Sequence, residues 1–593
     1  MHTTPLLKLL RRLWQHISLR RRVQFSLLFL VMILTSFAEV ISIGVVLPFL
    51  GVLTAPERIF AHPIAQPFIH VLSLTEPKQL LLPLTFVFAI GALFSGGMRL
   101  ILLWAQTRLS HAIGADFSIS IYRRTLYQPY AVHVARNSSE MIAGISSKAN
   151  GVVYSTLMPV LNIFSSTLML TFILLALTTI DSMIAITAFA GFGAIYLVII
   201  FVTKKALVQD SQRINYESNQ VIKALQEGLG GIRDVLINST QTTYCNIFRK
   251  SDLLLRRATA NIAIISGSPR FGIEAVGMVL IAVFAYSLAS SSSGIVSAIP
   301  VLGALALGAQ RSLPMLQQAY SSWSLIRGGQ VLLNVTLDLL DQPLPAHADT
   351  PLPLPMPFKS SITLNNLTFK YTKNTPWVFQ YGLNLSIPKG SRIGFIGATG
   401  SGKSTLIDII MGLLRPTSGS VAIDGINITE QNHRGWMRHI AHVPQVIFLA
   451  DTSIVENIAF GVPVEQIDHT RLRQAAQKAQ IAQTIESWGK QYDTVVGERG
   501  VRLSGGQRQR IGIARALYKQ ADVIVFDEAT SALDNDTERM VMETIENLGN
   551  ELTVIIVAHR LTTLKNCTQI VELEDGKIAQ IGSYLDIVEA KNY

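Results

Sequence analysis

Cysteine and charge are both scarce in this chain, and each scarcity excludes a class of protein. The 593 residues include only two cysteines, Cys245 and Cys567, which lie far apart in the sequence. Such a pair does not make the disulfide framework of a small secreted protein, so we expect two reduced thiols. Charged residues make up 15% of the chain and hydrophobic residues 49%, with a mean hydropathy of +0.37. That balance is too apolar for a soluble enzyme of this length and indicates a membrane protein.

Six apolar stretches are long enough to cross a bilayer. They lie near residues 23–53, 79–104, 155–180, 182–203, 271–290 and 295–316. The basic segment RRLWQHISLRRR before the first stretch imitates the start of a signal peptide, but that stretch is too long for one and five more follow it. We therefore predict six membrane spans and, given the length of the chain, at least one further domain.

Lysine and arginine gather on one side of the predicted membrane. They precede the first span, lie between spans two and three, and lie between spans four and five: Lys8, Arg11, Arg12, Arg20, Arg21, Arg22, Arg123, Arg124, Lys204, Lys205, Arg249, Lys250, Arg256 and Arg257. The opposite loops, at 178–182 and 290–294, are short or nearly uncharged. By the positive-inside rule both termini are cytoplasmic. The net charge of +11 is then explained by a surface facing lipid headgroups, and we expect no nucleic-acid partner.

The chain changes character after a proline-rich stretch. The two long loops on the basic side have the composition of helices, which at 1.5 Å rise per residue would carry the spans far into the cytosol. The prolines of LLDQPLPAHADTPLPLPMPFKS then mark a linker, and the residues beyond it have the composition of an α/β domain. We place a transmembrane domain at 1–342, the linker at 343–359 and the α/β domain at 360–593.

A phosphate-binding loop opens the second domain. Residues 392–414, RIGFIGATGSGKSTLIDIIMGLL, have the pattern of a buried strand, a glycine turn and an amphipathic helix. The turn fits G-x-x-x-x-G-K-[ST] in the structural context that gives this pattern its meaning. Backbone N–H groups would face the phosphates, Lys403 would reach the β and γ oxygens, and Ser404 would bind Mg²⁺. The residues expected to hold the nucleotide here are Gly397, Gly400, Ser401, Gly402, Lys403, Ser404 and Thr405.

Two carboxylates end an apolar strand farther along the chain. In ADVIVFDEAT, residues 521–530, Asp527 is placed to hold the magnesium shell, and Glu528 is placed to polarise an attacking water. An apolar strand that ends in acids is common by itself. Beside a phosphate loop, however, the pair indicates a nucleotide-hydrolysing site.

A second glycine-containing loop, LSGGQ at 503–507, begins another helix. Its serine and helix N-terminus offer a second anion-binding surface. Phosphoryl transfer needs donors around the transferred group and a site closed to water, which one phosphate loop does not supply. From the residues alone, the two loops could serve one nucleotide within a chain or across two chains.

From about residue 360 onward the chain resembles the ATP-binding cassette family, whose signature is LSGGQ. The family's elements occur in order: FKY, GATGSGKST, VPQ, VGERG, LSGGQ, VIVFDE, SALD and VAH. The resemblance implies an exporter-type half-transporter, with an all-α domain of six transmembrane helices followed by an α/β nucleotide-binding domain. It also implies a homodimer in which the signature of one subunit closes over the phosphate loop of its partner, with ATP and Mg²⁺ at both sites.

The same resemblance assigns roles to individual residues. Tyr371 would stack on adenine, Gln445 would sense Mg²⁺ and the attacking water, and His559 would contact the γ-phosphate. Glu498 lies in a loop similar to the one that contacts the spans in exporters. The remaining residues, expected at the partner's phosphates or at the dimer seam, are Ser504, Gly506, Gln507 and Asp534.

Five ionisable residues lie within or at the ends of the predicted spans, where charge is costly: Glu39, Arg99, Arg270, Glu274 and Arg311. The arginines could line a cavity for an anionic headgroup, because guanidinium suits phosphate. Equally, Glu39 could neutralise an arginine in a structural ion pair. The segments 38–50, 268–274 and 308–315 resemble those of exporters related to the lipid-linked oligosaccharide flippase of bacterial glycosylation.

These features favour an ATP-driven exporter or flippase in the plasma membrane. Its cargo would be an amphiphile such as a lipid-linked oligosaccharide or glycolipid, moved outward from the cytoplasmic side. The alternative is a multidrug or peptide exporter with the same ATPase, although no cysteine-protease constellation precedes the spans. A cassette protein acting on DNA or ribosomes is opposed by six spans. The two helical extensions are expected to end near 127–140 and 212–222, and these ends are the expected coupling segments between the domains.

Overall fold

The structure is a computed structural model in which two compact units are described. Its described residues are 5–54, 56–63, 65–136, 141–142, 144–178, 182–289, 295–529, 533–546, 552–558 and 561–589. A helical unit comprises residues 1–128 and 136–345, and an α/β unit comprises residues 129–135 and 346–593. The short segment 129–135, which contains α6 (Tyr130–Ala135), thus belongs with the α/β unit although it lies between long helices in the sequence.

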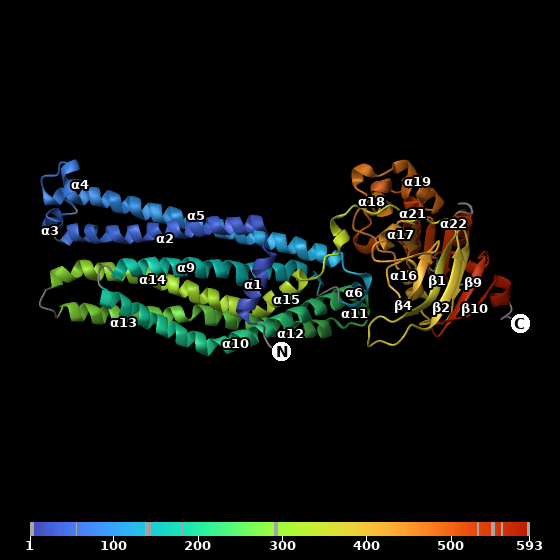
Figure 1. Ribbon diagram of the computed structural model, residues 1–593, viewed down its shortest axis with the longest axis horizontal. Helices are drawn as coiled ribbons and strands as arrows, with labels where there is room; N and C mark the ends of the chain where they lie inside the picture. The colour runs from blue at the N-terminus through green and yellow to red at the C-terminus, as the bar shows by residue number, and fades with distance from the viewer. Residues whose placement is uncertain are drawn as a thin grey trace. The chain divides into compact units, whose positions relative to one another are not determined.

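Long helices running side by side build the helical unit (Figure 1). The principal ones are α2 (Leu19–Thr54), α5 (Leu81–Leu126), α9 (Met158–Thr178), α10 (Ser182–Gly230), α12 (Gln241–Gly267), α13 (Pro269–Ala289) and α14 (Ile295–Gly328), whereas α1 (Leu6–His16) and α15 (Gln330–Leu340) have 11 residues each. Shorter helices are α3 (Pro56–Phe60), α4 (Gln66–Val71), α8 (Ala149–Val152) and α11 (Ile232–Ile237). Single turns occur at Pro77–Leu80, Gly144–Lys148 and Val153–Leu157.

Five helical stretches among the described residues are long and apolar enough to span a membrane. They are Leu19–Leu53, Pro77–Leu126, Ala149–Thr178, Phe189–Gly230 and Gln241–Val279. Large apolar side chains on α2 and α5 point outward, among them Leu30 at 54% exposure and Leu93 at 77%. Surfaces of this kind indicate contact with lipid or with another protein. The expected sixth span, 295–316, falls in α14, and the side chains of 295–309 lie outside the described residues.

Two helices are far longer than a bilayer requires. α5 has 46 residues and α10 has 49, so at about 1.5 Å per residue each extends well past a hydrocarbon core of about 30 Å. The predicted extensions are therefore present. The expectation that the second one ends near 212–222 is wrong, because α10 continues unbroken to Gly230 and the chain turns at 231–240 around α11. Residues 212–222 contain no glycine or proline to stop a helix, whereas glycines occur at 228, 230 and 231.

Two sheets form the frame of the α/β unit. The antiparallel sheet has the order β2-β1-β4-β5, with β1 (Ser361–Phe369), β2 (Phe379–Pro388), β4 (Ser418–Ile423) and β5 (Ile426–Asn427). The second sheet has the order β10-β9-β3-β8-β7-β6, with β3 (Arg392–Ile396), β6 (Ile440–Val443), β7 (Val523–Asp527), β8 (Thr553–Val557), β9 (Gln569–Glu574) and β10 (Lys577–Gly582). In the second sheet every pair is parallel except β10 with β9.

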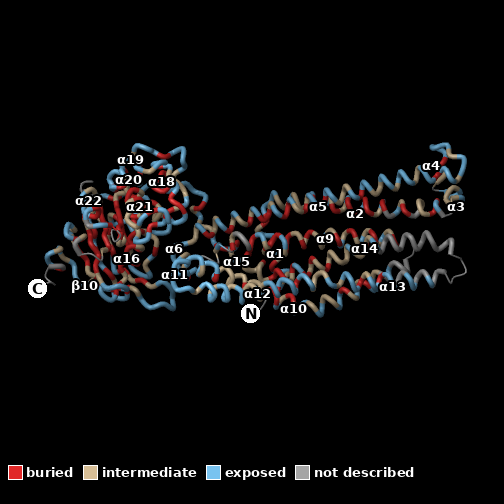
Figure 2. The backbone as a smooth tube through the Cα atoms, turned by 180° about the vertical axis from the view of Figure 1, so that it is seen from behind, coloured by how far each residue is buried: buried red, intermediate tan, exposed pale blue. Residues whose placement is uncertain are grey.

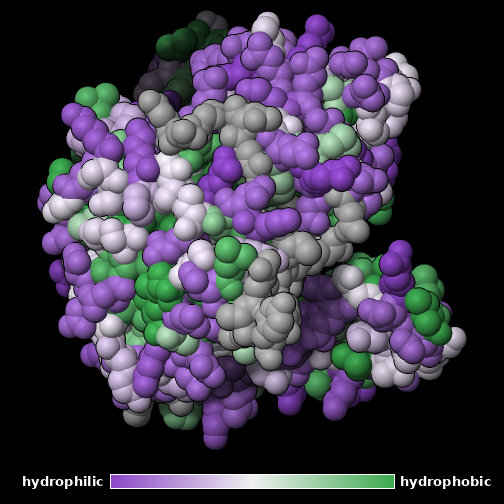
Figure 3. Space-filling model, turned by 90° about the vertical axis from the view of Figure 1, so that its right-hand side faces the viewer, coloured by the Kyte–Doolittle hydropathy of each residue, from purple (hydrophilic) through white to green (hydrophobic). Residues whose placement is uncertain are grey.

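Helices cover the parallel strands, whose residues are buried on both faces (Figure 2). The helices are α16 (Lys403–Ile410), α17 (His433–Met437), α18 (Ile454–Ile458), α19 (His469–Lys478), α20 (Ala482–Glu486), α21 (Gly505–Lys519) and α22 (Asn535–Glu546). This burial explains why β7 and β8 are continuous apolar runs rather than alternating ones. The outer face of the unit seen in Figure 3 is mostly hydrophilic, in contrast to the exposed apolar side chains of α2 and α5.

Part of the proline-rich segment packs into the core of the α/β unit. Met356 and Phe358, within the predicted linker 343–359, are 8% and 5% exposed and belong to the core around Trp436. The ring of Phe358 meets that of Trp436 edge-on at 5.4 Å between centroids. Prolines prevent a helix or central strand here, but an extended chain can still bury its apolar side chains.

Asp424 ties the start of β1 to the turn after β4. Its carboxylate accepts hydrogen bonds from the backbone N–H groups of Lys359, Ser360 and Ser361. Burial raises the pKa of Asp424, but these bonds and one from the Ser360 hydroxyl outweigh it and lower the pKa to about 2. The ionised carboxylate therefore stabilises the fold above its unfolded pKa near 4, and this contribution is lost as the pH falls toward 2.

Replacing Asp424 with asparagine is expected to lower the stability of the α/β unit by about 1–2 kcal/mol at pH 7, after allowance for solvent screening. The difference from the wild type should shrink as the pH approaches 3. Thermal unfolding of the detergent-solubilised chain at both pH values would measure it. Asp451→Asn, at an exposed position, is the matched control. An equal loss at both pH values would show that the ionised carboxylate is not responsible.

Candidate functional site

Parallel strands bring the predicted nucleotide residues to one edge of the sheet. β3 pairs with β8, and β8 with β7, so Ile396, Val557 and Asp527 lie at neighbouring carboxyl ends. The phosphate loop, residues 397–405, follows β3 directly and runs into α16. Ligands of open α/β sheets bind at this edge. The predicted strand, glycine turn and helix are therefore confirmed.

At two of its glycines, Gly397 and Gly402, the loop has no room for a side chain. A Cβ on Gly397 would lie 2.1 Å from the carbonyl oxygen of Leu573. Gly402 has a φ of 100° and precedes the first residue of α16, where a Cβ would lie 2.6 Å from the ring of Phe379. Glycine is required at both positions, which leaves the backbone N–H groups open to a ligand.

Lys403 is 8% exposed and folds back over the loop. Its Nζ donates to the carbonyl oxygens of Gly397 at 2.8 Å and Ala398 at 2.9 Å. Beside it, the buried Ser401 Oγ has no hydrogen-bond partner within the described chain, whereas Ser404 is exposed. A buried cation and an unsatisfied hydroxyl around a glycine cradle suit the phosphates of a nucleotide.

A hydrogen bond joins two of the predicted site residues, Gln445 and Glu528. Gln445 Nε2 donates to Glu528 Oε2 at 2.6 Å, although the two residues are 83 positions apart in the chain. Glu528 itself has a φ of 52°, a left-handed conformation that is costly for glutamate, and its N–H donates to the carbonyl oxygen of Val557. Strain of this kind is concentrated at functional sites.

Burial changes the acidity of the carboxylates around this edge. The pKa of Asp527 is raised, first by burial and then by the charge of Glu528, while Lys403 opposes the change. Asp408 was not predicted as a site residue, yet burial and the charge of Asp527 raise its pKa to about 6. The signal for Asp408 was an acid in the otherwise apolar helix LIDII. Together these acids give the site a local negative charge that a magnesium ion would neutralise.

Tyr371 lies beside the phosphate loop. Its hydroxyl is 3.0 Å from the Thr405 Oγ1, and its ring meets Phe369 edge-on at 5.0 Å. The tyrosine is 39% exposed, so part of the ring is open to a ligand. The position is therefore compatible with stacking on a base.

The signature loop, residues 503–507, is organised as a helix start. Ser504 is the N-cap of α21, its Oγ accepting from the Gln507 N–H while the Gln507 side chain accepts from the Ser504 N–H. This capping box occupies the Gln507 amide oxygen. Arg508 then donates to the carbonyl oxygens of Leu503 and Gly500, which joins the signature loop to the VGERG loop that carries the exposed Glu498.

Asp534 and His559 are the remaining predicted site residues, and the structure describes the surroundings of Asp534 only. Asp534 accepts from the N–H and hydroxyl of Thr537, and its pKa is lowered by these bonds and by the charge of Arg510 on α21. Within the described residues, no hydrogen bond or ion pair joins residues 503–507 to the phosphate loop. His559 lies outside the described residues.

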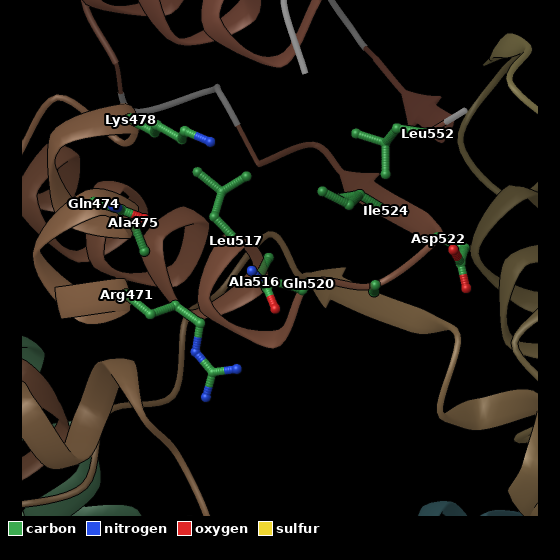
Figure 4. Close-up of a pocket in the computed structure, with 11 residues that line it drawn as sticks. Arg471, Gln474, Ala475, Lys478, Ala516, Leu517, Gln520, Asp522, Ile524 and Leu552 are labelled. Carbon is green, nitrogen blue, oxygen red and sulfur yellow. The ribbon is translucent and has the colours of Figure 1, made fainter. Parts of the chain in front are cut away.

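A second pocket of the α/β unit lies away from these residues (Figure 4). It measures about 290 Å³ and is lined by residues of α19, the end of α21 and the start of β7. Asp522 precedes β7 and Leu552 precedes β8, so the pocket is at the amino ends of the strands, the edge opposite the phosphate loop. In Figure 4 the side chains of Arg471 and Asp522 lie on opposite sides of the view. This pocket is not the nucleotide site.

The helical unit contains an ion cluster of three residues from three helices. Glu39 on α2 is fully buried and pairs with Arg99 on α5 and with Arg311 on α14, the latter at 2.8 Å. The Ser95 hydroxyl also donates to Glu39. The two arginines are each 35% exposed, and Arg99 Nε has no partner within the described chain. One carboxylate thus serves two guanidinium groups, which leaves the cluster with one excess positive charge.

Arg270 does not join this cluster. It pairs instead with Glu274 one turn along α13, with 2.7 Å between Arg270 Nε and Glu274 Oε1. The side chains of Arg270 and Glu274 are 62% and 43% exposed. This separate pair has no net charge.

Comparisons with known proteins agree with the site. Residues 381–531 match the family described as ABC transporter. The chain is 26% identical over 482 residues to the ATP-dependent lipid A-core flippase of Alkalilimnicola ehrlichii, which covers 80% of both proteins. It is 39% identical over 266 residues to ABC transporter B family member 1 of Arabidopsis thaliana, a match of 44% of this chain but only 20% of that relative's length.

A solved structure shares the fold of nearly the whole chain. The structure of a bacterial Atm1-family ABC exporter with ATP bound aligns with a TM-score of 0.78 at 23% identity and covers 96% of each chain. This likeness confirms the predicted architecture of membrane-spanning helices followed by an α/β nucleotide-binding domain. The match of residues 381–531 to the ABC transporter family, the flippase relative and this fold together support an ABC exporter half-transporter.

Proposed function

We propose that two copies of this chain form a transporter that hydrolyses ATP and moves an amphiphilic substrate outward from the cytoplasmic side of the plasma membrane. The hydrogen bond between Gln445 and Glu528 at the end of β7 carries this proposal, because it aligns a base with the phosphate loop in a chain that also spans a membrane. The cargo is a lipid-linked oligosaccharide or a glycolipid. A relative named as a lipid A-core flippase supports a lipid cargo.

The site residues divide the chemistry of hydrolysis among themselves. Backbone N–H groups of the phosphate loop and Lys403 hold the phosphates, and Glu528 takes a proton from the attacking water. Gln445 fixes the orientation of the Glu528 carboxylate. Ser404, Asp527 and Gln445 would hold Mg²⁺, which would supply positive charge to neutralise the phosphates. His559 contacts the γ-phosphate and orients it with Glu528.

Closure of the site requires a second subunit. Ser504 and Gly506 of one copy face the γ-phosphate held by the other, and Asp534 lies at the seam between them. Three observations support this arrangement: the exposed Ser504, the charge of Arg510 beside Asp534, and the lack of a described contact from the signature loop to its own phosphate loop. Residues 129–135, which group with the α/β unit, transmit closure to the spans.

The ion cluster supports an anionic headgroup in the cargo. Glu39 balances only one of its two arginines, and a second anion would satisfy the other. Phosphate or pyrophosphate suits the planar guanidinium groups. We propose that the cluster combines a structural ion pair with a site for the headgroup. Arg270, paired with Glu274, contributes less to this proposal.

The experiment measures ATPase activity in liposomes with a polyprenyl-pyrophosphate glycan or a hydrophobic cationic drug. We expect stimulation by the glycan, and a loss of at least about tenfold in its apparent affinity in Arg99→Ala and Arg311→Ala, from one lost charge-assisted contact. Each variant still pairs Glu39 with the remaining arginine. Arg249→Ala, at an exposed position on α12, is the control. Unchanged glycan stimulation in both variants would refute the headgroup site, and stimulation by the drug alone would favour the multidrug alternative.

A further inference from the structure

The first helix of the helical unit lies across the long helices rather than along them (Figure 1). On its inner side Leu9, Leu13 and Ile17 are at most 5% exposed and join the core formed with α2, α5 and α9. On its outer side Lys8 and Arg11 are exposed. A transverse amphipathic helix with cations on one face and leucines on the other is typical of an element that lies in the plane of a membrane surface.

An apolar groove opens between this helix, the first turns of α2 and the start of α9. We call it the α1 groove. It measures about 500 Å³, and all of its lining residues are apolar except Ser26. Trp14, Phe25, Phe29 and Phe164 are among them. Exposed leucines continue the apolar surface along α2, with Leu27 at 59% and Leu30 at 54% exposure. A space of this kind next to a lipid-facing surface has the character of an acyl-chain site rather than a water-filled one.

The mouth of the α1 groove is positively charged. Arg22 lies over the ring of Trp14, with 5.6 Å between its guanidinium carbon and the ring centroid. It donates to the carbonyl oxygens of Trp14 and Ile17, each at 3.0 Å, and no carboxylate partner for it occurs among the described residues. Its neighbours differ, because Arg21 pairs with Asp116 and Arg12 pairs with Asp338. The charge of Arg22 is therefore not neutralised within the described chain.

The apolar α1 groove and the unneutralised charge of Arg22 lie close together near the start of α2. Exposed Arg20 and Arg11 add to the charge on this side. A lipid with one acyl chain in the groove would bring its phosphate to the depth of Arg22, since α2 enters the membrane directly after this residue. Guanidinium binds phosphate more strongly than it binds the zwitterionic headgroups that carry a compensating amine.

We propose that the α1 groove binds one acyl chain of an anionic phospholipid from the cytoplasmic leaflet, with its phosphate at Arg22. This proposal rests on the membrane orientation given under the proposed function, and it concerns a resident lipid rather than the transported cargo. Its position has a mechanical consequence. Arg12 and His16 of the same helix bind Asp341 at the end of α15, so the lipid would hold α1 in the place from which it braces the last helix before the α/β unit.

The fluorescence of Trp14 tests the proposal without ATP or transport. The full chain is reconstituted in phosphatidylcholine vesicles that contain a small fraction of acyl-brominated phosphatidylglycerol or, in parallel, acyl-brominated phosphatidylcholine. The Trp14 signal is the difference between the wild type and Trp14→Phe, because five other tryptophans are present. We expect the anionic lipid to quench this signal several-fold more than the zwitterionic lipid at equal fraction. Equal quenching by the two lipids would overturn the selective site.

Substitutions at Ser26 and Arg22 separate the contribution of the groove from that of the charge. Ser26→Phe fills the groove without removing a core side chain and should abolish the extra quenching, while Ser26→Ala should keep it. Arg22→Gln should lose the preference for the anionic lipid and Arg22→Lys should retain it, which a purely structural role of the arginine in holding carbonyls would not produce. Arg249→Gln removes an equal charge on α12 and should change nothing.

The lipid proposal and the transport proposal can fail independently, because quenching and ATP hydrolysis are measured separately. Selective quenching in a protein that hydrolyses no ATP would support the lipid site even though the transport proposal had failed. If Trp14 is instead shielded from both brominated lipids in a dimer, a second copy of the chain covers the groove and the lipid proposal is wrong. Retention of the preference in both Ser26→Phe and Arg22→Gln would equally refute it.

Discussion

Glu528→Gln is expected to reduce the rate of ATP hydrolysis by about 10²–10⁴-fold, the usual range for loss of a general base. The amide cannot take a proton from water, but it has nearly the same shape and can keep the hydrogen bond with Gln445. Binding of ATP depends on the phosphate loop and should survive. The measurement is single-turnover hydrolysis together with equilibrium nucleotide binding.

The same variant tests the dimer. Because ATP is bound and not consumed, Glu528→Gln should hold two copies together, and tagged and untagged chains mixed with ATP should copurify more completely than in the wild type. Glu543→Gln on the exposed face of α22 makes the same chemical change outside the site and should behave as the wild type. Normal turnover by Glu528→Gln would refute the assigned base. Full turnover by a strictly monomeric wild type would refute the shared site.

Removing Glu39 should affect the fold more than any other single change in the helical unit. Glu39→Ala leaves Arg99 and Arg311 without their common anion, and truncation of one partner of a buried ion pair costs about 3–5 kcal/mol. We expect poor recovery of the variant from membranes and a lower temperature of unfolding in detergent. Thermal unfolding followed by tryptophan fluorescence is the measurement.

A compensating variant distinguishes lost pairing from lost volume. Replacing all three members by apolar residues, as Glu39→Leu with Arg99→Met and Arg311→Met, removes the charges together and should recover most of the stability. Glu39→Gln keeps the volume but not the charge and should resemble Glu39→Ala. If Glu39→Ala unfolds at the wild-type temperature, the cluster does not hold α2, α5 and α14 together.

The parts of the site that could be predicted from sequence are those set by local backbone chemistry. The loop at 397–405 requires glycine where a side chain would collide with Leu573 or Phe379. The glycine pattern therefore identifies this loop from the amino-acid sequence alone. The strand that ends at Asp527 can also be predicted from the sequence, because parallel strands buried on both faces are continuously apolar. The likeness to the cassette family then supplied the roles that spacing alone does not give.

The contacts that sequence reasoning missed join residues distant in the chain or depend on helix length. Asp408 becomes unusual only because the fold buries it near Asp527, 119 positions later. An ion pair of Glu39 with one arginine was among the predicted alternatives, but its pairing with two depends on the register of three helices, which hydropathy does not specify. The end of α10 was misplaced because amphipathic helical composition continues through 212–222 without a break.

The attachment of α1 to α15 bears on how the protein should be handled in the laboratory. Arg12 and His16 pair with Asp341, so a helix near the start of the helical unit is bound to the last helix of that unit. A shortened clone that begins at residue 19 would release the carboxylate end of α15 and uncover Leu333 and Leu337, both fully buried in the core shared with α1. Affinity tags are therefore better joined to the other end of the polypeptide, and trimming for crystallisation should spare residues 6–16.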